Sequence, residues 1–128
     1  MRIIKIKSAF EDSRGKITDI LVDEPVEHVN LITFKKNAVR GNHYHKQSLH
    51  YNYVLRGTIK LYTKKATGDV ETTIMTDGDL ALIFPSERHA LVALEDSELL
   101  VFTRGTRGGE NYEQDTYRLD TDESLTKE

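Results

Sequence analysis

Hydrophobic and polar residues alternate over short stretches of this chain, and turn-forming residues separate the stretches. This two-residue period indicates β-strands that bury one face, and the β-branched and aromatic residues that strands favour are concentrated in the same stretches. No segment sustains a helical period over about 11 residues or more. We therefore predict strands around Ile4 and Ile6 and over residues 17–22, 29–34, 51–55, 58–62, 70–75, 80–84, 90–94 and 99–102.

The turns between these strands favour a closed all-β fold. Asp12-Ser13-Arg14-Gly15 is a turn signal, and Arg56-Gly57 predicts a tight hairpin between the strands at 51–55 and 58–62. Many short strands with regular turns are typical of a β-sandwich or a β-barrel, and a small barrel can hold one ligand in its mouth.

The composition is that of one small folded domain. The chain has 128 residues, of which 38% are hydrophobic and 30% are charged, and it has no cysteine. The missing cysteines exclude disulfides, thiolate metal sites and cysteine nucleophiles. No apolar run approaches the roughly 20 residues of a membrane helix, and the N-terminal residues do not form a secretory signal. We expect a cytoplasmic protein with no membrane partner, and the net charge of -3 gives no reason to expect nucleic acid.

Acidic residues are concentrated at the C-terminal end. Residues 105–128 contain seven acids and three bases and lack apolar periodicity. We therefore expect a single barrel domain over residues 1–104 and a partly ordered acidic tail over 105–128, with a solvated end from Asp120 onward.

Histidines are the residues best suited to chemistry in this sequence. His43 and His45 are two apart, so a strand places both imidazoles on one face, about 6.5–7 Å apart along the backbone. His50 begins the next predicted strand, and a hairpin could return it to the pair, while His89 starts the strand at 90–94. Four imidazoles without a thiolate favour Zn, Ni, Fe or Cu over Mg or Ca. The remaining histidine, His28, is expected to be a packed or surface residue.

The segment around these histidines resembles the first cupin motif, G-x5-H-x-H-x3,4-E-x6-G. The match runs from His43 to Gly57, with His50 at the usual glutamate position, while Asn37 stands where the family has its leading glycine. The resemblance implies a jelly-roll barrel with the histidines in its mouth. It also implies one divalent metal there, held by His43, His45, His50 and His89.

The second cupin motif, G-x5-P-x-G-x2-H, is matched more loosely. Gly78 and His89 have the required spacing, but Phe84 and Ser86 replace the usual proline and glycine, and Pro85 comes one place late. The separation of the two motifs is that of a small cupin. Cupins of this size commonly pair, so we expect a homodimer, with the apolar N-terminal strand as a plausible exchanged element.

Two further segments resemble one branch of the cupins. The D-x-R-G of residues 12–15 and the R-G-x-H-x-H-K of residues 40–46 are similar to segments of deoxysugar 3,5-epimerases and of 3,4-ketoisomerases acting on dTDP-4-keto-6-deoxy sugars. The resemblance implies that His43 and His45 are catalytic and that Arg40 and Arg14 hold phosphates of the substrate. Those relatives generally lack His50 and use the barrel without a metal.

Strand alternation adds one candidate binding residue to this set. His50 and Asn52 share a face, so Asn52 is a candidate cavity residue that binds substrate, while Tyr51 and Tyr53 point away from it.

We expect an isomerase or epimerase acting on a nucleotide-linked keto sugar in polysaccharide biosynthesis. The alternatives are a metal-dependent dioxygenase acting on a small substrate and a non-catalytic small-molecule-binding cupin.

Overall fold

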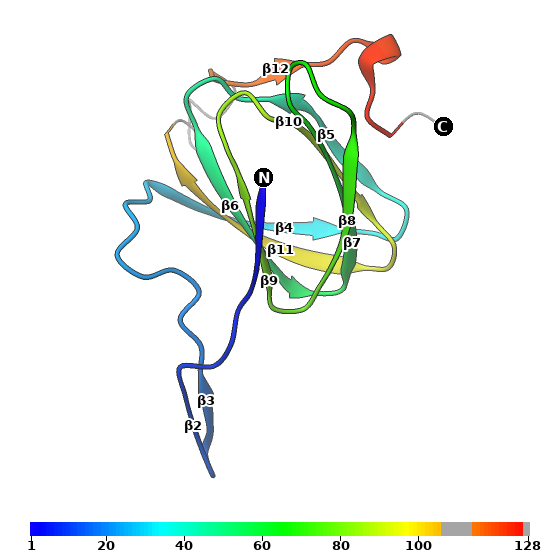
Figure 1. Ribbon diagram of the computed structural model, residues 1–128. Coiled ribbons are helices and arrows are strands. Elements are labelled where there is room, and N and C mark those ends of the chain that lie inside the picture. Colours follow the sequence, from blue (N-terminus) through cyan, green and yellow to red (C-terminus); the bar gives the residue numbers. More distant parts are fainter. Residues whose placement is uncertain (106–113, 127–128) are drawn as a thin grey trace.

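The computed structural model describes residues 1–105 and 114–126, and nearly all of its regular structure is β-strand (Figure 1). The strands of the barrel are β1 (Arg2–Lys5), β4 (His28–Phe34), β5 (Val39–Tyr44), β6 (Leu49–Arg56), β7 (Thr58–Lys64), β8 (Glu71–Thr76), β9 (Asp79–Ile83), β10 (Arg88–Ala93), β11 (Ser97–Arg104) and β12 (Tyr117–Arg118). A separate hairpin is formed by β2 (Phe10–Asp12) and β3 (Gly15–Ile17), and one 3-10 helix, η2, covers Thr121–Glu123. The all-β prediction is confirmed.

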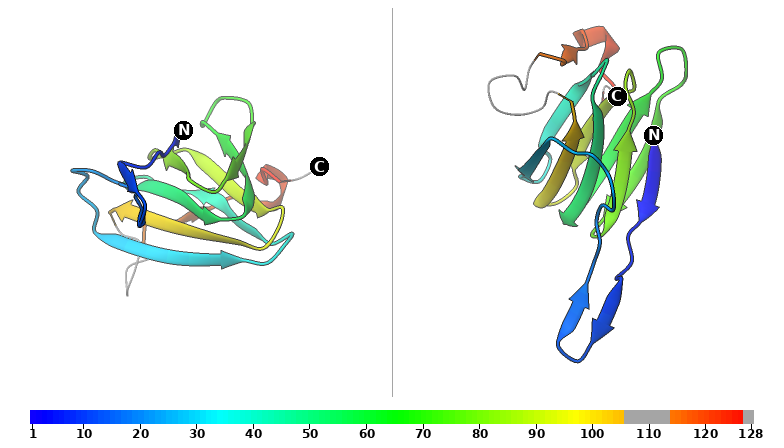
Figure 2. Two further views of the ribbon diagram at one scale, coloured as in Figure 1. Left: turned by 90° about the horizontal axis from the view of Figure 1, so that it is seen from below. Right: turned by 90° about the vertical axis from the view of Figure 1, so that its left-hand side faces the viewer.

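Two antiparallel five-stranded sheets face each other (Figure 2). Their strand orders are β1-β9-β6-β11-β4 and β12-β5-β10-β7-β8. From β4 to β7 and from β8 to β11, each strand lies in the sheet opposite to that of the strand before it. This alternation is the connectivity of a jelly roll. Because the chain crosses the barrel at each step, residues that are close in sequence come to face each other across the interior.

This crossing contradicts the hairpin predicted at Arg56-Gly57. The strands on either side, β6 and β7, lie in different sheets and do not pair. Gly57 has φ of +107° and marks a corner where the chain changes sheets. An added Cβ at Gly57 would also collide with Ser97, so only glycine fits this corner.

The inner side of the first sheet changes from apolar to polar along its strands. At one end Val54 of β6 is paired with Leu99 of β11, and at the other end His50 is paired with Thr103. All four residues are buried. The apolar end belongs to a core of buried residues from both sheets, namely Phe34, Val54, Ile59, Leu61, Met75, Ala81, Ile83, Leu91, Ala93, Leu99 and Val101. The barrel is therefore filled at one end and polar at the other.

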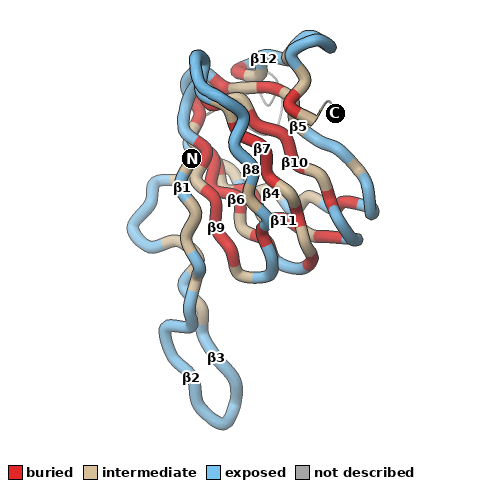
Figure 3. The backbone as a smooth tube through the Cα atoms, turned by 45° about the vertical axis from the view of Figure 1, so that its right-hand side comes forward, coloured by how far each residue is buried: buried red, intermediate tan, exposed pale blue. Residues whose placement is uncertain are grey.

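The hairpin β2–β3 projects away from the barrel and is exposed on all sides (Figure 3). The strand predicted over residues 17–22 is wrong beyond Ile17, because the following residues leave the hairpin as an irregular connection to β4. Glu24, in this connection, accepts hydrogen bonds from Tyr51 (2.9 Å) and Arg104 (3.2 Å). Polar contacts with the outside of the sheet thus hold this part of the chain, without strand pairing.

Residues 114–126 return to the barrel. The short strand β12 pairs with β5, and Leu125 is buried against Tyr62 and Ala90. The predicted division at residue 104 therefore does not coincide with the end of packed structure. Nor is Leu125 part of a solvated end, although Asp120 and the η2 residues are exposed as expected. Residues 106–113, 127 and 128 of the predicted tail lie outside the described residues.

No helix within residues 1–105 or 114–126 is long and apolar enough to cross a membrane.

Candidate functional site

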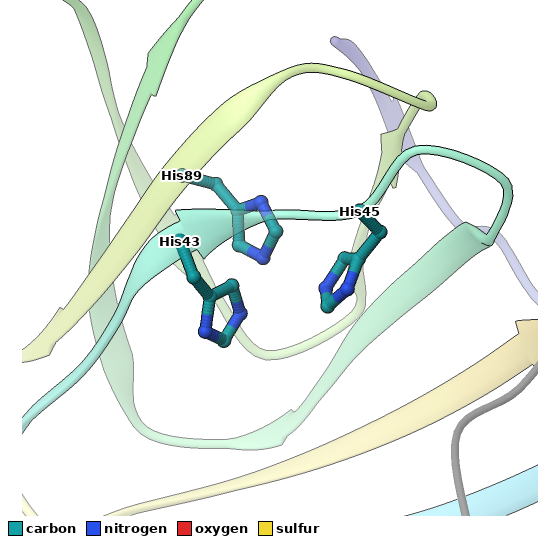
Figure 4. A group of neighbouring side chains, drawn as sticks. All are labelled: His43, His45 and His89. Atoms are coloured by element: carbon teal, nitrogen blue, oxygen red, sulfur yellow. The ribbon is translucent and has the colours of Figure 1, made fainter. Parts of the chain in front are cut away.

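Three buried histidines lie around one space at the polar end of the barrel (Figure 4). His43 belongs to β5, His45 follows the end of β5, and His89 belongs to β10. One ring nitrogen of each lies within 4.8 Å of the corresponding atoms of the others. The ring centroids are 4.8 Å apart for His43 and His45 and 4.7 Å apart for His43 and His89. Pairing of β5 with β10 places His89 directly opposite His43, which explains how residues distant in sequence meet.

His50 reaches the cluster from the opposite sheet. Its ring stacks on that of His45, with centroids 4.1 Å apart and planes inclined by 7°. The predicted hairpin between β5 and β6 is wrong, because these strands lie in different sheets. The structure therefore brings all four predicted histidines together, but His50 is not one of the three whose nitrogens lie within 4.8 Å of each other.

Two backbone carbonyls orient the imidazoles of His45 and His89. Nδ1 of His45 lies 2.9 Å from the carbonyl oxygen of Asp115, and Nδ1 of His89 lies 3.2 Å from that of Glu87. A carbonyl oxygen only accepts hydrogen bonds, so each Nδ1 carries a proton and donates it. The lone pair of the neutral ring is then on Nε2, where it can take a proton or bind a metal.

The carboxylate of Asp115 holds the connection between β5 and β6. It accepts hydrogen bonds from the backbone amides of Lys46 (3.0 Å), Gln47 (2.9 Å) and Ser48 (2.8 Å) and from the Ser48 hydroxyl (2.8 Å). Burial by itself raises the pKa of Asp115, but the hydrogen bonds from Gln47, Ser48 and Lys46 outweigh it, and the pKa is lowered below its usual value. The group is therefore a stable anion at neutral pH.

The histidines line a pocket of about 800 Å³. Its other polar lining residues include Arg40 of β5, Arg118 of β12, and Asn30 and Asn52 of the first sheet. Asn52 therefore lies where strand alternation predicted it. The amide oxygen of Asn30 is buried and has no hydrogen-bond partner among the described residues, which leaves it available to a polar ligand group. Pockets that bind small ligands usually measure about 300–1,000 Å³.

The two arginines predicted to bind substrate lie in different places. Arg40 lines the pocket, where it donates a hydrogen bond to the carbonyl of Thr33 (3.1 Å) and lies 5.2 Å from the ring centre of Phe34. Arg14 lies at the turn of the projecting hairpin, where its guanidinium donates to Asp12 (3.1 and 2.7 Å). Arg14 does not face the cavity of its own chain, because its D-x-R-G turn closes a hairpin that points away from the barrel.

Sequence reasoning missed three residues of the site: Asn30, Asp115 and Arg118. Asn30 was detectable, because it is a polar residue at an inward position of a strand whose next inward positions are Ile32 and Phe34. Asp115 and Arg118 carried no such signal. Both belong to an acidic segment without periodicity, and only the pairing of β12 with β5 brings them to the histidines.

A family model described as the cupin domain matches residues 30–103 of the chain, which is more than half of its length. No curated protein matches.

Many solved structures are similar to this one. A double mutant of the QdtA 3,4-ketoisomerase from Thermoanaerobacterium thermosaccharolyticum, in complex with TDP, is 26% identical, with a TM-score of 0.76 and coverage of 92% of this chain and 86% of that chain. A 3,4-ketoisomerase from Helicobacter canadensis is 18% identical, with a TM-score of 0.78 and coverage of 97% and 93%. The dTDP-4-dehydrorhamnose 3,5-epimerase from Sulfolobus tokodaii is 20% identical, with a TM-score of 0.76 and coverage of 94% and 77%. The TM-scores demonstrate a shared fold.

Proposed function

The chain belongs to the cupin domain family, and from this premise we propose that it is an isomerase or epimerase acting on a nucleotide-linked keto sugar. The observation that carries the proposal is the composition of one pocket, which combines buried histidines with Arg40 and Arg118. Histidines suit proton transfer next to a carbonyl, and arginines suit the diphosphate of the nucleotide. The 3,4-ketoisomerase structure with bound TDP supports the same substrate class.

The proposed reaction moves protons only. A carbon beside the sugar's carbonyl group carries an acidic proton, which a histidine Nε2 removes while negative charge collects on the carbonyl oxygen. Return of a proton to the other face of the same carbon inverts it. Return to the former carbonyl carbon, with transfer of the neighbouring hydroxyl proton to the former carbonyl oxygen, moves the carbonyl by one position. His45 suits the role of base because the Asp115 carbonyl keeps its proton on Nδ1, and His43 is the adjacent group for returning the proton.

The remaining pocket residues have roles in binding. Arg40 and Arg118 would each offer a planar guanidinium to phosphate oxygens, a bidentate arrangement that lysine cannot reproduce. Asn30 and Asn52, on the opposite sheet, would bind the hydroxyl groups of the sugar. A pocket with this polar lining favours a polar substrate over the small apolar substrate of many dioxygenases.

As an alternative use of the same histidines, we propose that they hold one divalent transition metal, in which case His45 would be a ligand and not the base. Three buried nitrogens lie within 4.8 Å of each other, whereas tetrahedral ligands at about 2.0–2.1 Å from zinc are about 3.4 Å apart. The nitrogens would therefore have to approach each other by up to about 1.4 Å to hold the ion. The Nδ1 atoms of His45 and His89 donate to backbone carbonyls, as is usual for histidines that bind a metal through the other ring nitrogen. A bound metal would polarise the substrate carbonyl. If it is iron, a dioxygenase is the second candidate function.

A homodimer is part of the proposal, and the outer face of the first sheet supports it. Leu31, Leu100 and Tyr53 are aligned across β4, β11 and β6, and Val29 is paired with Phe102 beside them. Val29 and Leu31 are each 57% exposed. A continuous apolar surface of this kind supports an interface with a second copy of the chain.

The projecting hairpin points to the same conclusion. Phe10 and Ile17 are paired across it and are 52% and 61% exposed. An isolated two-stranded hairpin is marginally stable in water. A second copy would give these side chains an apolar surface to cover.

Solvent-exchange NMR tests the proposed reaction. Incubation of dTDP-4-keto-6-deoxyglucose with the enzyme in D₂O should introduce deuterium at the carbon beside the carbonyl, even when little product accumulates. His45→Gln should remove the exchange. Exchange no faster than in buffer would refute the isomerase proposal.

A titration with dTDP tests binding separately. Arg40→Lys should weaken binding by about 10- to 150-fold, since one charge-assisted hydrogen bond contributes about 1.5–3 kcal/mol. Arg2→Lys is the matched control, because Arg2 is an exposed residue of β1 and is not part of the pocket lining.

A further inference from the structure

One residue outside the barrel strands contacts both the histidine cluster and the connection beside it. The Asp115 carboxylate accepts four hydrogen bonds from Lys46, Gln47 and Ser48, as described above. Its backbone carbonyl accepts the Nδ1 proton of His45. The side chain and the backbone of Asp115 therefore contact consecutive parts of the chain, His45 and residues 46–48.

The segment that carries Asp115, residues 114–126, has a second anchor. Asn42 accepts hydrogen bonds from the Leu119 amide through its backbone carbonyl (2.9 Å) and from the Leu125 amide through Oδ1 (2.8 Å), and it donates to the Thr126 hydroxyl (3.2 Å). Leu125 is buried beneath this anchor. None of these contacts involves Asp115, so the segment should stay docked when the Asp115 side chain is changed.

A third set of contacts lies between the two anchors. Tyr117 stacks on Tyr44, with ring centroids 5.3 Å apart, and the Lys46 ammonium lies 4.3 Å from the centre of the Tyr117 ring. The contact between Tyr44 and Tyr117 does not involve the carboxylate, so it should keep β12 paired with β5 when Asp115 is changed. Attachment of the segment therefore does not require the Asp115 side chain. The contacts of this side chain are all with residues 46–48, next to His45.

We propose that Asp115 is a positioning residue for His45, which it fixes in the tautomer and orientation that present Nε2 to the pocket. The effect of this positioning on catalysis rests on the proposed function, in which His45 is the base. Without the carboxylate, the connection at residues 46–48 and the Asp115 carbonyl would each lose their fixed place. The His45 ring would then exchange between tautomers, and only part of the population would offer a lone pair on Nε2.

NMR of protein labelled with ¹⁵N in its histidines tests this without any substrate. In the wild type, His45 should show a protonated Nδ1 and an unprotonated Nε2. In Asp115→Ala the two nitrogen shifts should move toward each other as the tautomers mix. Asp115→Asn should lie between the two, because its amide oxygen can still accept the bonds from Gln47 and Ser48. Asp122→Ala is the matched control, since Asp122 is an exposed acid of the same segment.

The deuterium-exchange assay then measures the consequence for catalysis. In Asp115→Ala, kcat should fall about 10–100-fold, the range found when a hydrogen-bond partner of a metal-binding histidine is removed, while KM changes less than twofold. Unchanged tautomer signals in Asp115→Ala would overturn the proposal, even if activity fell. If Asp115→Ala shows mixed tautomers and the wild type has no exchange activity, the positioning of His45 is supported and the proposed isomerase is refuted. If Asp115→Ala does not fold, the comparison of Asp115→Asn with the wild type decides in the same way.

Discussion

Replacing Gly41 with alanine should separate the two strands that hold His43 and His89. Gly41 has φ of +93°, and a Cβ built on it would lie 2.8 Å from the carbonyl oxygen of His89 and 3.0 Å from Cα of Ala90. Both neighbours are backbone atoms of β10, so neither can move without moving the strand. The glycine of the R-G-x-H segment is therefore needed for the close approach of β5 and β10.

Gly41→Ala should lower the free energy of unfolding for two reasons, and the same substitution at a second glycine measures one of them separately. Gly78 has a similar φ of +86°, but the nearest atom to its added Cβ is 3.8 Å away. Gly78→Ala should therefore cost only the backbone strain, about 1–2 kcal/mol. Gly41→Ala should cost the same strain plus the overlap with β10, which for overpacking is about 1–3 kcal/mol.

Urea unfolding of both variants, followed by circular dichroism or tyrosine fluorescence, measures the difference. Gly41→Ala should be less stable than Gly78→Ala by about 1–3 kcal/mol, and it should also weaken ligand or metal binding, because His43 moves away from His89. Gly78→Ala should retain binding. Equal loss of stability in the two variants, with binding intact in both, would refute the argument that Gly41 permits the close approach.

Three further predictions test the metal, the dimer and the acid response. His89→Ala should abolish metal binding, seen as the loss of about one equivalent per chain by elemental analysis, whereas His28→Ala should retain it; protein that stays metal-free with Zn, Ni, Fe and Co would exclude the site. Leu31→Glu should convert a dimer to a monomer in light scattering, and Ile74→Glu, an exposed residue of the other sheet, should not; a monomeric wild type would exclude the dimer. The pKa of Asp115 is lowered in the folded protein, so its stabilising contribution is present above the unfolded value of about 3.9 and is lost as the pH falls through the folded pKa. The difference in free energy of unfolding between wild type and Asp115→Asn, measured in urea, should therefore narrow as the pH falls below about 3.9. A difference that stays constant would contradict the stabilising role of the ionised carboxylate.

Seven strands of the barrel were predictable because their signals are local. Alternation identified β4, β6, β7, β8, β9, β10 and β11 within a few residues of their observed ends. The same signal failed at residues 18–22, because an alternating segment becomes a strand only where a partner strand is available, and the hairpin β2–β3 carries this part of the chain away from both sheets. Which sheet a strand joins was not predictable either. Arg56-Gly57 has the composition of a hairpin turn, but the corner at Gly57 is decided by Ser97, a residue about 40 positions away.

The histidine site illustrates the same division between local and distant causes. The spacing of His43 and His45 predicted two imidazoles on one side of a strand, and both rings reach the same pocket although β5 ends at Tyr44. His50 was predicted to join them through a hairpin, and it joins them by crossing to the opposite sheet. This route explains its stacked position: it faces His45 from across the interior, while His43 and His89 converge as neighbours within one sheet. Asp115 lies further still from any sequence signal, because its hydrogen bonds with Lys46, Gln47 and Ser48 join residues 67 to 69 positions apart. A residue that acts only by holding another in place needs neither a motif nor a period, so the folded structure is where such a residue can first be found.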